Sequence, residues 1–234
     1  MCTLTVLRQS DGIRLHMNRD ERHSRVAELS PRIIDSSNGI FGPLDPEGGG
    51  TWIAHNDQGY WGCLLNGYLE KDVVKLQIKD LSRGAILTTL LAEADPIEAA
   101  GQFDPTRFQS FRLVVGDASK FVLWAWDGHE YYQDAFQAHV NDTAYFLTSS
   151  SWEPEKVIQI RAELFSSWAE GLGDALESFV GVPEFHSSSL PQPSSAPLMF
   201  RPHSCTKSIT SLWVQDRQCQ MDYQTVSSQA VACQ

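Results

Sequence analysis

The chain opens on Met1-Cys2-Thr3-Leu4-Thr5-Val6-Leu7, a cysteine at position 2 followed by β-branched and aliphatic residues. Such residues favour strands, so we expect one strand over Thr3–Leu7 and a second over Ile13–Met17. The intervening Gln9-Ser10-Asp11-Gly12 contains Asp-Gly, which supplies the positive φ that tight turns need. The stretch therefore predicts a β-hairpin that brings the end of the second strand to the level of Cys2.

Cys2 itself has two interpretations. It is either a small residue buried at a strand end, or a nucleophile that becomes the N-terminus once Met1 is removed. In the second case the new α-amino group, with a pKa of about 7.7–8.0, would act as general base for the thiol on the same residue. The position of Cys2 alone does not decide between the two.

A polar run, His16-Met17-Asn18-Arg19-Asp20-Glu21-Arg22, ends the second predicted strand. Charge runs are most often solvated turns. The predicted hairpin nevertheless places Asn18–Asp20 at the same end as Cys2, where an arginine favours the thiolate and an aspartate orients an ammonium group or a substrate amine. Arg19 and Asp20 are therefore candidate partners of the thiol.

The remaining chain mixes strands and helices without the strict alternation of a parallel sheet, which favours an α+β fold with antiparallel sheets and helices on their outer faces. Val157, Ile160, Leu164 and Trp168 form a predicted apolar helix face, and Ser187–Ala196, rich in serine and proline, is expected to be a surface loop. Helices are expected over Leu81–Ala94, Pro96–Gly101 and Glu153–Trp168, and further strands over Thr51–His55, Tyr60–Leu65, Phe111–Gly116, Phe121–Trp126, Ala144–Thr148, Ser208–Val214 and Gln218–Tyr223.

Composition narrows the class of protein. The 234 residues carry a formal net charge of −11, which argues against a general nucleic-acid or anionic-membrane binder. No stretch has the length of a transmembrane helix, and charged residues interrupt any signal-like segment at the start. The five cysteines have no CxxC spacing, which argues against a zinc site or a disulfide framework and predicts a reducing, cytoplasmic location. These cysteines are Cys2, Cys63, Cys205, Cys219 and Cys233.

Several of these features together resemble the NRDE family, which includes the animal transport and Golgi organisation proteins. The resemblance rests on Met1-Cys2-Thr3, on Asn18-Arg19-Asp20-Glu21, on Gly49-Gly50-Thr51-Trp52-Ile53 and on Leu64-Leu65-Asn66-Gly67, and it extends over the whole chain. It implies one domain over residues 1–234, with the four-layer αββα sandwich of N-terminal nucleophile hydrolases.

The resemblance also implies roles for particular residues. Asn66 would donate an amide hydrogen bond to an oxyanion, although a turn residue before Gly67 is an equally good interpretation. Two positions depart from the related hydrolases: Ser149 or Ser150 stands where an asparagine is found, and Lys207 replaces a late arginine and lacks its planar fork. The implied site is Cys2, Arg19, Asp20 and Asn66 for catalysis, with Asn18, Ser149 and Lys207 for substrate binding.

The function implied is that of a hydrolase or acyltransferase acting on a non-peptide amide bond of a small molecule, without metal or cofactor. The alternative is a carrier that binds haem or another hydrophobic anion and does not use Cys2 as a nucleophile. The seven histidines show no HxxxH or HExxH spacing, so they predict no metalloenzyme, and the sequence assigns no haem ligand. The oligomeric state stays open.

Overall fold

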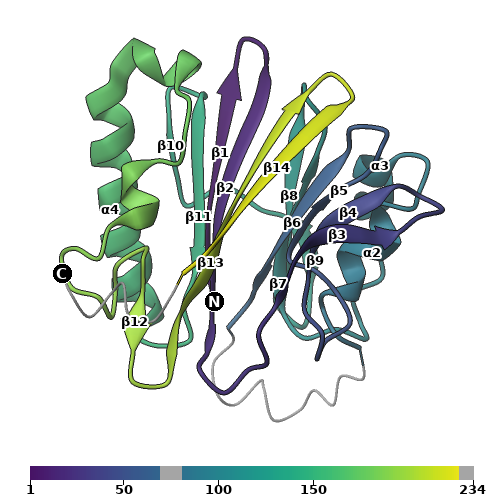
Figure 1. Cartoon of the computed structure of the whole chain (residues 1–234), viewed down its shortest axis with the longest axis horizontal. Helices are drawn as coiled ribbons and strands as arrows, with labels where there is room; N and C mark the ends of the chain where they lie inside the picture. The colour runs from purple at the N-terminus through teal and green to yellow at the C-terminus, as the bar shows by residue number, and fades with distance from the viewer. Residues whose placement is uncertain (69–80, 227–234) are drawn as a thin grey trace. The chain divides into compact units, whose positions relative to one another are not determined.

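The computed structural model describes residues 1–68 and 81–226. Cys233 lies outside the described part of the chain, as does Asp80, a candidate cap for the helix expected over Leu81–Ala94. The chain divides into two compact units (Figure 1). The first consists of residues 1–25, 136–213 and 220–234, and the second of residues 26–135 and 214–219.

The first unit is built on an antiparallel sheet whose strand order is β10-β11-β1-β2-β13-β12, with β14 paired to β13. The predicted N-terminal hairpin is present, and it pairs Gln9 with Gly12 across the turn. The strands are β1 (Cys2–Gln9), β2 (Gly12–Arg22), β10 (Ala138–Val140), β11 (Ala144–Ser149), β12 (Phe200–Arg201), β13 (Ser204–Gln215) and β14 (Gln218–Thr225).

Helical segments cover one face of this sheet. The long helix α4 (Pro154–Leu172) and the 3-10 helices η1 (Gly173–Ser178) and η2 (Glu184–Ser187) follow β11 in the chain. Phe165 of α4 stacks on Phe146 of β11 with ring centroids 5.2 Å apart. The strand residues that face the helices, such as Leu7, share one buried cluster with them.

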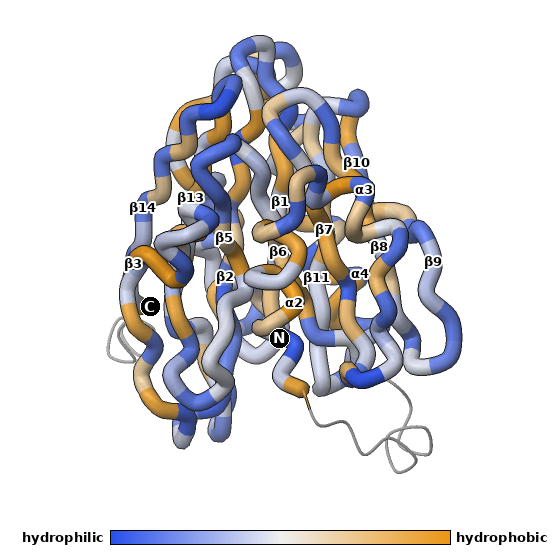
Figure 2. Tube along the Cα trace, turned by 90° about the vertical axis from the view of Figure 1, so that its right-hand side faces the viewer, coloured by the Kyte–Doolittle hydropathy of each residue, from blue (hydrophilic) through white to orange (hydrophobic). Residues whose placement is uncertain are grey.

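The second unit holds a second antiparallel sheet, ordered β3-β4-β5-β6-β7-β8-β9. Two short helices, α2 (Ala85–Leu90) and α3 (Pro96–Gly101), pack on it through a buried apolar cluster that includes Leu87 and Leu113. Figure 2 shows the hydrophobic residues along strands such as β7. The strands are β3 (Leu29–Asp35), β4 (Ile40–Leu44), β5 (Ile53–His55), β6 (Trp61–Asn66), β7 (Phe111–Gly116), β8 (Phe121–Trp126) and β9 (Tyr131–Gln133).

The glycine run before β5 serves packing within the second unit. The Thr51 N–H donates to the Gly84 carbonyl at 3.2 Å, and a Cβ built on Gly50 would lie 2.2 Å from the Gly84 carbonyl carbon. Only glycine fits such an approach of two backbones. The glycine run therefore lets the backbone at Gly50 lie directly against the backbone at Gly84.

Three sequence-based expectations need correction. The helix expected over Leu81–Ala94 is limited to Ala85–Leu90. In α4 the most buried residues are Val157, Arg161, Phe165 and Ala169, so the buried face is rotated from the predicted one. The expected surface loop Ser187–Ala196 is wrong at its end, because Ser195 and Ala196 are fully buried.

A buried histidine pair makes the stability of the first unit depend on pH. His16 donates or accepts a hydrogen bond with Ser211 through Nδ1 at 2.9 Å, and its ring centroid lies 6.0 Å from that of His186. Burial, with a smaller contribution from Arg14, lowers the pKa of His16 from 6.5 to about 3. The unfolded chain binds this proton more readily than the folded chain does. The contribution of His16 to the free energy of unfolding is therefore fully present above pH 6.5 and is lost as the pH drops toward about 3.

We expect His16→Asn, which keeps a polar partner for Ser211 but does not titrate, to weaken this dependence. Between pH 7 and pH 5 the parent chain should lose about 2 kcal/mol more unfolding free energy than the variant. Urea unfolding followed by circular dichroism at both pH values measures the difference. An identical loss in the two proteins would contradict the assignment to His16.

Candidate active site

Cys2 is the first residue of β1, and its strand neighbours are directly opposed to it. It pairs with Arg19 of β2 on one side and with Ser149 of β11 on the other. Directly opposed residues of antiparallel strands point to the same face of a sheet, so these three side chains share one face. All three are buried, at 6%, 5% and 3% exposure. The register thus gathers the predicted thiol, one predicted cation and one predicted hydroxyl.

The chemistry of the Cys2 thiol is set by opposing effects. Burial is the largest, and it raises the pKa of the thiol, while the N-terminal amine and Arg19 act to lower it. Asp20 and Glu21 raise it further. Glu21 lies 3.7 Å from the Arg19 guanidinium. The thiol is therefore protonated at neutral pH, and it needs a base to become a nucleophile.

The Ser149 hydroxyl is buried beside Cys2 and makes no hydrogen bond to any residue that the structure describes. Buried polar atoms are normally satisfied, and an exception calls for an explanation. A hydroxyl carries one donor and two acceptor sites. The Ser149 hydroxyl can therefore form a hydrogen bond with a ligand bound on the sheet face that carries the Cys2 thiol.

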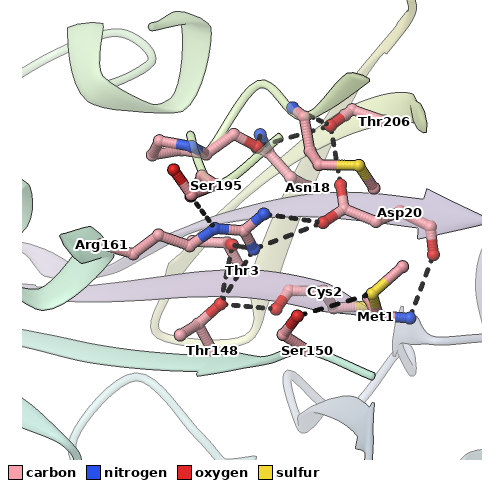
Figure 3. A network of polar contacts seen from close by, with 12 residues as sticks. Met1, Cys2, Thr3, Asn18, Asp20, Thr148, Ser150, Arg161, Ser195 and Thr206 are labelled. Atoms are coloured by element: carbon pink, nitrogen blue, oxygen red, sulfur yellow. Dashed lines mark hydrogen bonds and ion pairs between the residues drawn. The ribbon is translucent and has the colours of Figure 1, made fainter. Parts of the chain in front are cut away.

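Met1 extends the strand beyond Cys2. Its amine donates to the Asp20 carbonyl at 3.0 Å, and its carbonyl accepts from the Asp20 N–H at 2.9 Å (Figure 3). The N-terminal amine is thus held by the backbone of Asp20. The Asp20 side chain is directed elsewhere, because strand alternation points it to the face opposite Cys2.

Three polar groups lie around the Met1 sulfur. Arg201 Nη1 lies 3.0 Å from Sδ and the Ser151 hydroxyl 3.3 Å, whereas the Ser150 hydroxyl, 3.8 Å away, donates its hydrogen to the Trp152 carbonyl at 2.6 Å. Arg201 also donates to the Ser194 carbonyl and to the Ser150 hydroxyl, and it lies over the Trp152 ring at 4.8 Å. A thioether is a weak acceptor, so these donors suit an oxygen better than the sulfur they contact.

The Asp20 carboxylate belongs to a buried ion pair. Arg161 of α4 donates to Asp20 Oδ2 from Nη1 at 3.3 Å and from Nη2 at 3.2 Å. Both side chains are fully buried. The Thr206 hydroxyl donates to the other carboxylate oxygen at 2.7 Å. These contacts direct the Asp20 carboxylate toward the helical layer.

Arg161 ties three strands and a loop to the helix. Besides Asp20, it donates to the hydroxyls of Thr3 and Thr148 at 2.7 and 3.1 Å and to the Ser195 carbonyl at 3.1 Å (Figure 3). The Thr148 hydroxyl in turn donates to the Cys2 carbonyl at 3.0 Å. The backbone on each side of Cys2 is therefore fixed from the face opposite its thiol.

Asn18 also faces the helical layer. Its side-chain amide donates to the carbonyls of His186 and Pro197 at 2.9 and 2.8 Å, and its oxygen lies 2.6 Å from His186 Nδ1. The residue is fully buried. The Asn18 side chain therefore links β2 by hydrogen bonds to His186 in η2 and to Pro197 in the segment after it.

Two further residues were predicted for the site, Lys207 in the first unit and Asn66 in the second. Lys207 follows Thr206 on β13, so alternation puts it on the sheet face of Cys2, and it is partly exposed. Asn66 is the last residue of β6 in the second unit, where its backbone pairs with Phe111. Its neighbour Gly67 donates a backbone hydrogen bond to the Ser110 carbonyl at 2.9 Å.

Sequence reasoning did not identify Arg161, Thr206 or Arg201. For Arg161 a pattern was available: it stands four residues from Val157 and from Phe165, on the buried side of α4. A charged residue in such a register predicts a buried partner of opposite charge. For Arg201 no local pattern exists, because its contacts with Met1 and Ser150 span 200 and 51 positions of the chain.

The described residues contain neither a metal-binding cluster nor a membrane-spanning helix. In residues 1–68 and 81–226, no group of three or more His, Cys, Asp or Glu side chains is arranged to hold a metal ion. No helix in the same ranges is long and apolar enough to span a membrane.

Comparison with known proteins gives a family and a fold. The sequence profile of the family described as Transport and Golgi organisation 2 matches residues 1–234. No curated protein matches. Among solved structures, a Caenorhabditis elegans N-acylethanolamine-hydrolyzing acid amidase ortholog superposes with a TM-score of 0.65 at 15% identity, covering 97% of this chain and 100% of its own.

A mutant of the conjugated bile acid hydrolase from Clostridium perfringens superposes with a TM-score of 0.53 at 10% identity, covering 97% of this chain and 92% of its own. A second variant of that hydrolase gives 0.52 at 11% identity, covering 96% and 92%. Identities this low show the fold alone. The chain has the fold of N-terminal nucleophile hydrolases, and the two antiparallel sheets with their helices fit its αββα plan.

Proposed function

The chain belongs to the transport and Golgi organisation 2 family, and we propose that it is an N-terminal-cysteine hydrolase or acyltransferase acting on a non-peptide amide bond of a small molecule. One observation carries the proposal: the Cys2 thiol lies between Arg19 and an unpartnered buried Ser149 hydroxyl, on one face of the sheet. Cys2 supplies the nucleophile, Arg19 a cation, and Ser149 a hydroxyl that can donate a hydrogen bond to a substrate.

The reaction requires that Met1 be removed, so that the α-amine belongs to Cys2. This amine takes the thiol proton, and the sulfur attacks the amide carbonyl, forming a C–S bond and a tetrahedral oxyanion. The intermediate collapses as the C–N bond breaks and the leaving amine takes the proton back. Water, or an acceptor nucleophile in a transferase, then cleaves the thioester. Arg19 stabilises the thiolate.

Removal of Met1 would also change what the neighbouring donors face. Arg201, Ser150 and Ser151 now contact the Met1 sulfur. Without Met1 they would line a polar space beside the new N-terminus, suited to a substrate oxygen. We assign the Ser149 hydroxyl and this cluster to substrate or oxyanion binding, and we keep Asn66 and Lys207 as further candidates for the same role.

Asp20 and Asn18 receive positioning roles in this proposal. In the chain that still carries Met1, the Asp20 carbonyl accepts from the Met1 amine, and the Asp20 carboxylate is bound by Arg161. Once Met1 is removed, this carbonyl is the acceptor nearest along the strand to the new amine of Cys2. Asn18 links β2 by hydrogen bonds to the carbonyls of His186 and Pro197. Both residues shape the site without contacting the reacting bond.

The substrate class follows from the solved structures of similar fold. One is named for hydrolysing N-acylethanolamines and the other for hydrolysing conjugated bile acids. We propose by analogy an amide that joins an apolar acyl group to a small amine. A thiol nucleophile suits the reducing, cytoplasmic location predicted from the cysteines.

The first test is the intact mass of the protein purified from a cytosolic expression host. We expect the mass of the chain without one methionine residue, because a small residue at position 2 permits removal of Met1. Cys2→Leu, which blocks removal through its larger side chain, is the matched control and should keep the methionine. A parent chain that quantitatively retains Met1 would contradict the catalytic proposal.

The carrier hypothesis stays a prediction with its own test. A carrier of haem binds its ligand whether or not Cys2 is present, so haem titration of the parent chain and of Cys2→Ala should then give equal Soret shifts. An N-terminal-cysteine hydrolase is instead inactivated by the same substitution.

A further inference from the structure

A second cysteine of the first unit has a histidine ring beside its thiol. The sulfur of Cys205, near the start of β13, lies 3.5 Å from Nδ1 of His23, which follows β2. This pair is distinct from the contacts described for Cys2, Arg19 and Ser149, and the proposed reaction does not use it. We propose that Cys205 and His23 form a reactive thiol–imidazole pair, a modification site for small, uncharged, soft carbon electrophiles.

The tautomer of His23 is fixed by its second ring nitrogen. Nε2 lies 2.9 Å from the Arg201 carbonyl oxygen. A carbonyl only accepts, so Nε2 carries the hydrogen of the neutral ring. Nδ1 is then the unprotonated nitrogen, and it accepts the hydrogen bond of the Cys205 thiol. Nucleophile, base and orienting group thus stand in order.

The base is also held in place by its own backbone. The His23 N–H donates to the His203 carbonyl at 3.0 Å, and the ring lies 5.7 Å from the Phe200 ring. Phe200 is in turn the strand partner of Cys205. Ring and thiol are therefore anchored to the same β12–β13 hairpin, which maintains their contact.

Exposure differs between the two members of the pair. His23 is exposed, so the imidazolium that forms on proton transfer is solvated by water. Cys205 is 4% exposed, which restricts access to small reagents. With iodoacetamide as such a reagent, the thiol proton moves to Nδ1, the sulfur forms a bond to the CH2 carbon, and iodide leaves with the C–I electron pair.

Cys219 provides a comparison inside the same chain. It is more exposed than Cys205, but burial raises the pKa of its thiol to about 12. Cys63 is fully buried and reports on unfolding. Exposure alone predicts that Cys219 reacts before Cys205, whereas the thiol–imidazole pair predicts the reverse order.

The test is a timed iodoacetamide pulse on the full chain at pH 7, followed by digestion and mass spectrometry of each cysteine peptide. We expect Cys205 to be alkylated at least about tenfold faster than Cys219. In His23→Gln the side chain still donates to the Arg201 carbonyl but offers no basic nitrogen, so the Cys205 rate should fall at least about fivefold while Cys63 stays unlabelled.

Either of two results would overturn the proposal: a Cys205 rate no higher than that of Cys219, or an unchanged Cys205 rate in His23→Gln. Increased labelling of Cys63 would show that the variant has unfolded. In that case the proposal is judged by the alkylation rates in the parent chain alone, and Cys205 must react faster than Cys219.

Discussion

Cys2→Ala should abolish amide hydrolysis while leaving the fold intact. The substitution removes the sulfur that would form the acyl-enzyme but keeps the β1 backbone and the N-terminal amine. Loss of the nucleophile in a serine protease lowers kcat about 10⁶-fold, and we expect a loss of at least about 10⁴-fold for this chain. Hydrolysis of an N-acylethanolamine and of a conjugated bile acid, followed by release of the free amine, measures the effect.

The control for Cys2→Ala is Cys219→Ala, which removes a half-buried thiol on β14 and should keep the parent activity. Thermal unfolding of both variants separates a chemical loss from a structural one. Equal activity of Cys2→Ala and parent chain on a substrate that the parent hydrolyses would remove Cys2 from the mechanism. The fold would then serve a different chemistry or a binding function.

Much of the fold could be predicted because its signals are local. The turn of the N-terminal hairpin, the strands Phe111–Gly116 and Phe121–Trp126, and the helix Pro96–Gly101 match the structure at both ends. β3 was not predicted. It contains Pro31, which lacks a backbone donor and is unfavourable inside a sheet. It is an edge strand of its sheet, where a proline is tolerated.

The site could be predicted only in part. The two-residue turn between Gln9 and Gly12 sets the register, and this register alone places Arg19 opposite Cys2. The same register puts Asp20 on the other face, because successive side chains of a strand alternate. Grouping Arg19 and Asp20 together beside the thiol therefore overlooked the period of the strand.

Contacts between residues far apart in the sequence could not be predicted from the sequence patterns. Arg161 is separated from Asp20 by 141 positions, and their pairing depends on how α4 packs on the sheet. Sequence patterns report the period of an element but not its partner across a core. The contact of Arg201 with Met1 spans 200 positions and depends on where β12 lies relative to the start of β1.

Arg161→Met should strongly destabilise the first unit. It leaves the Asp20 carboxylate buried without its cation and removes donors from Thr3 and Thr148. Breaking one partner of a buried ion pair costs about 3–5 kcal/mol, because the remaining charge stays desolvated. Urea unfolding should show this loss as a lower midpoint with a similar slope.

Lys156→Met is the matched control on the same helix. Its ion pair with Glu153 is 3.0 Å long but 57% and 43% exposed, so its loss should cost no more than about 1 kcal/mol. The double variant Asp20→Asn with Arg161→Met removes both charges and should recover part of the stability lost in Arg161→Met alone. Equal destabilisation by Arg161→Met and Lys156→Met would show that the buried pair does not anchor β1 and β2 to the helix.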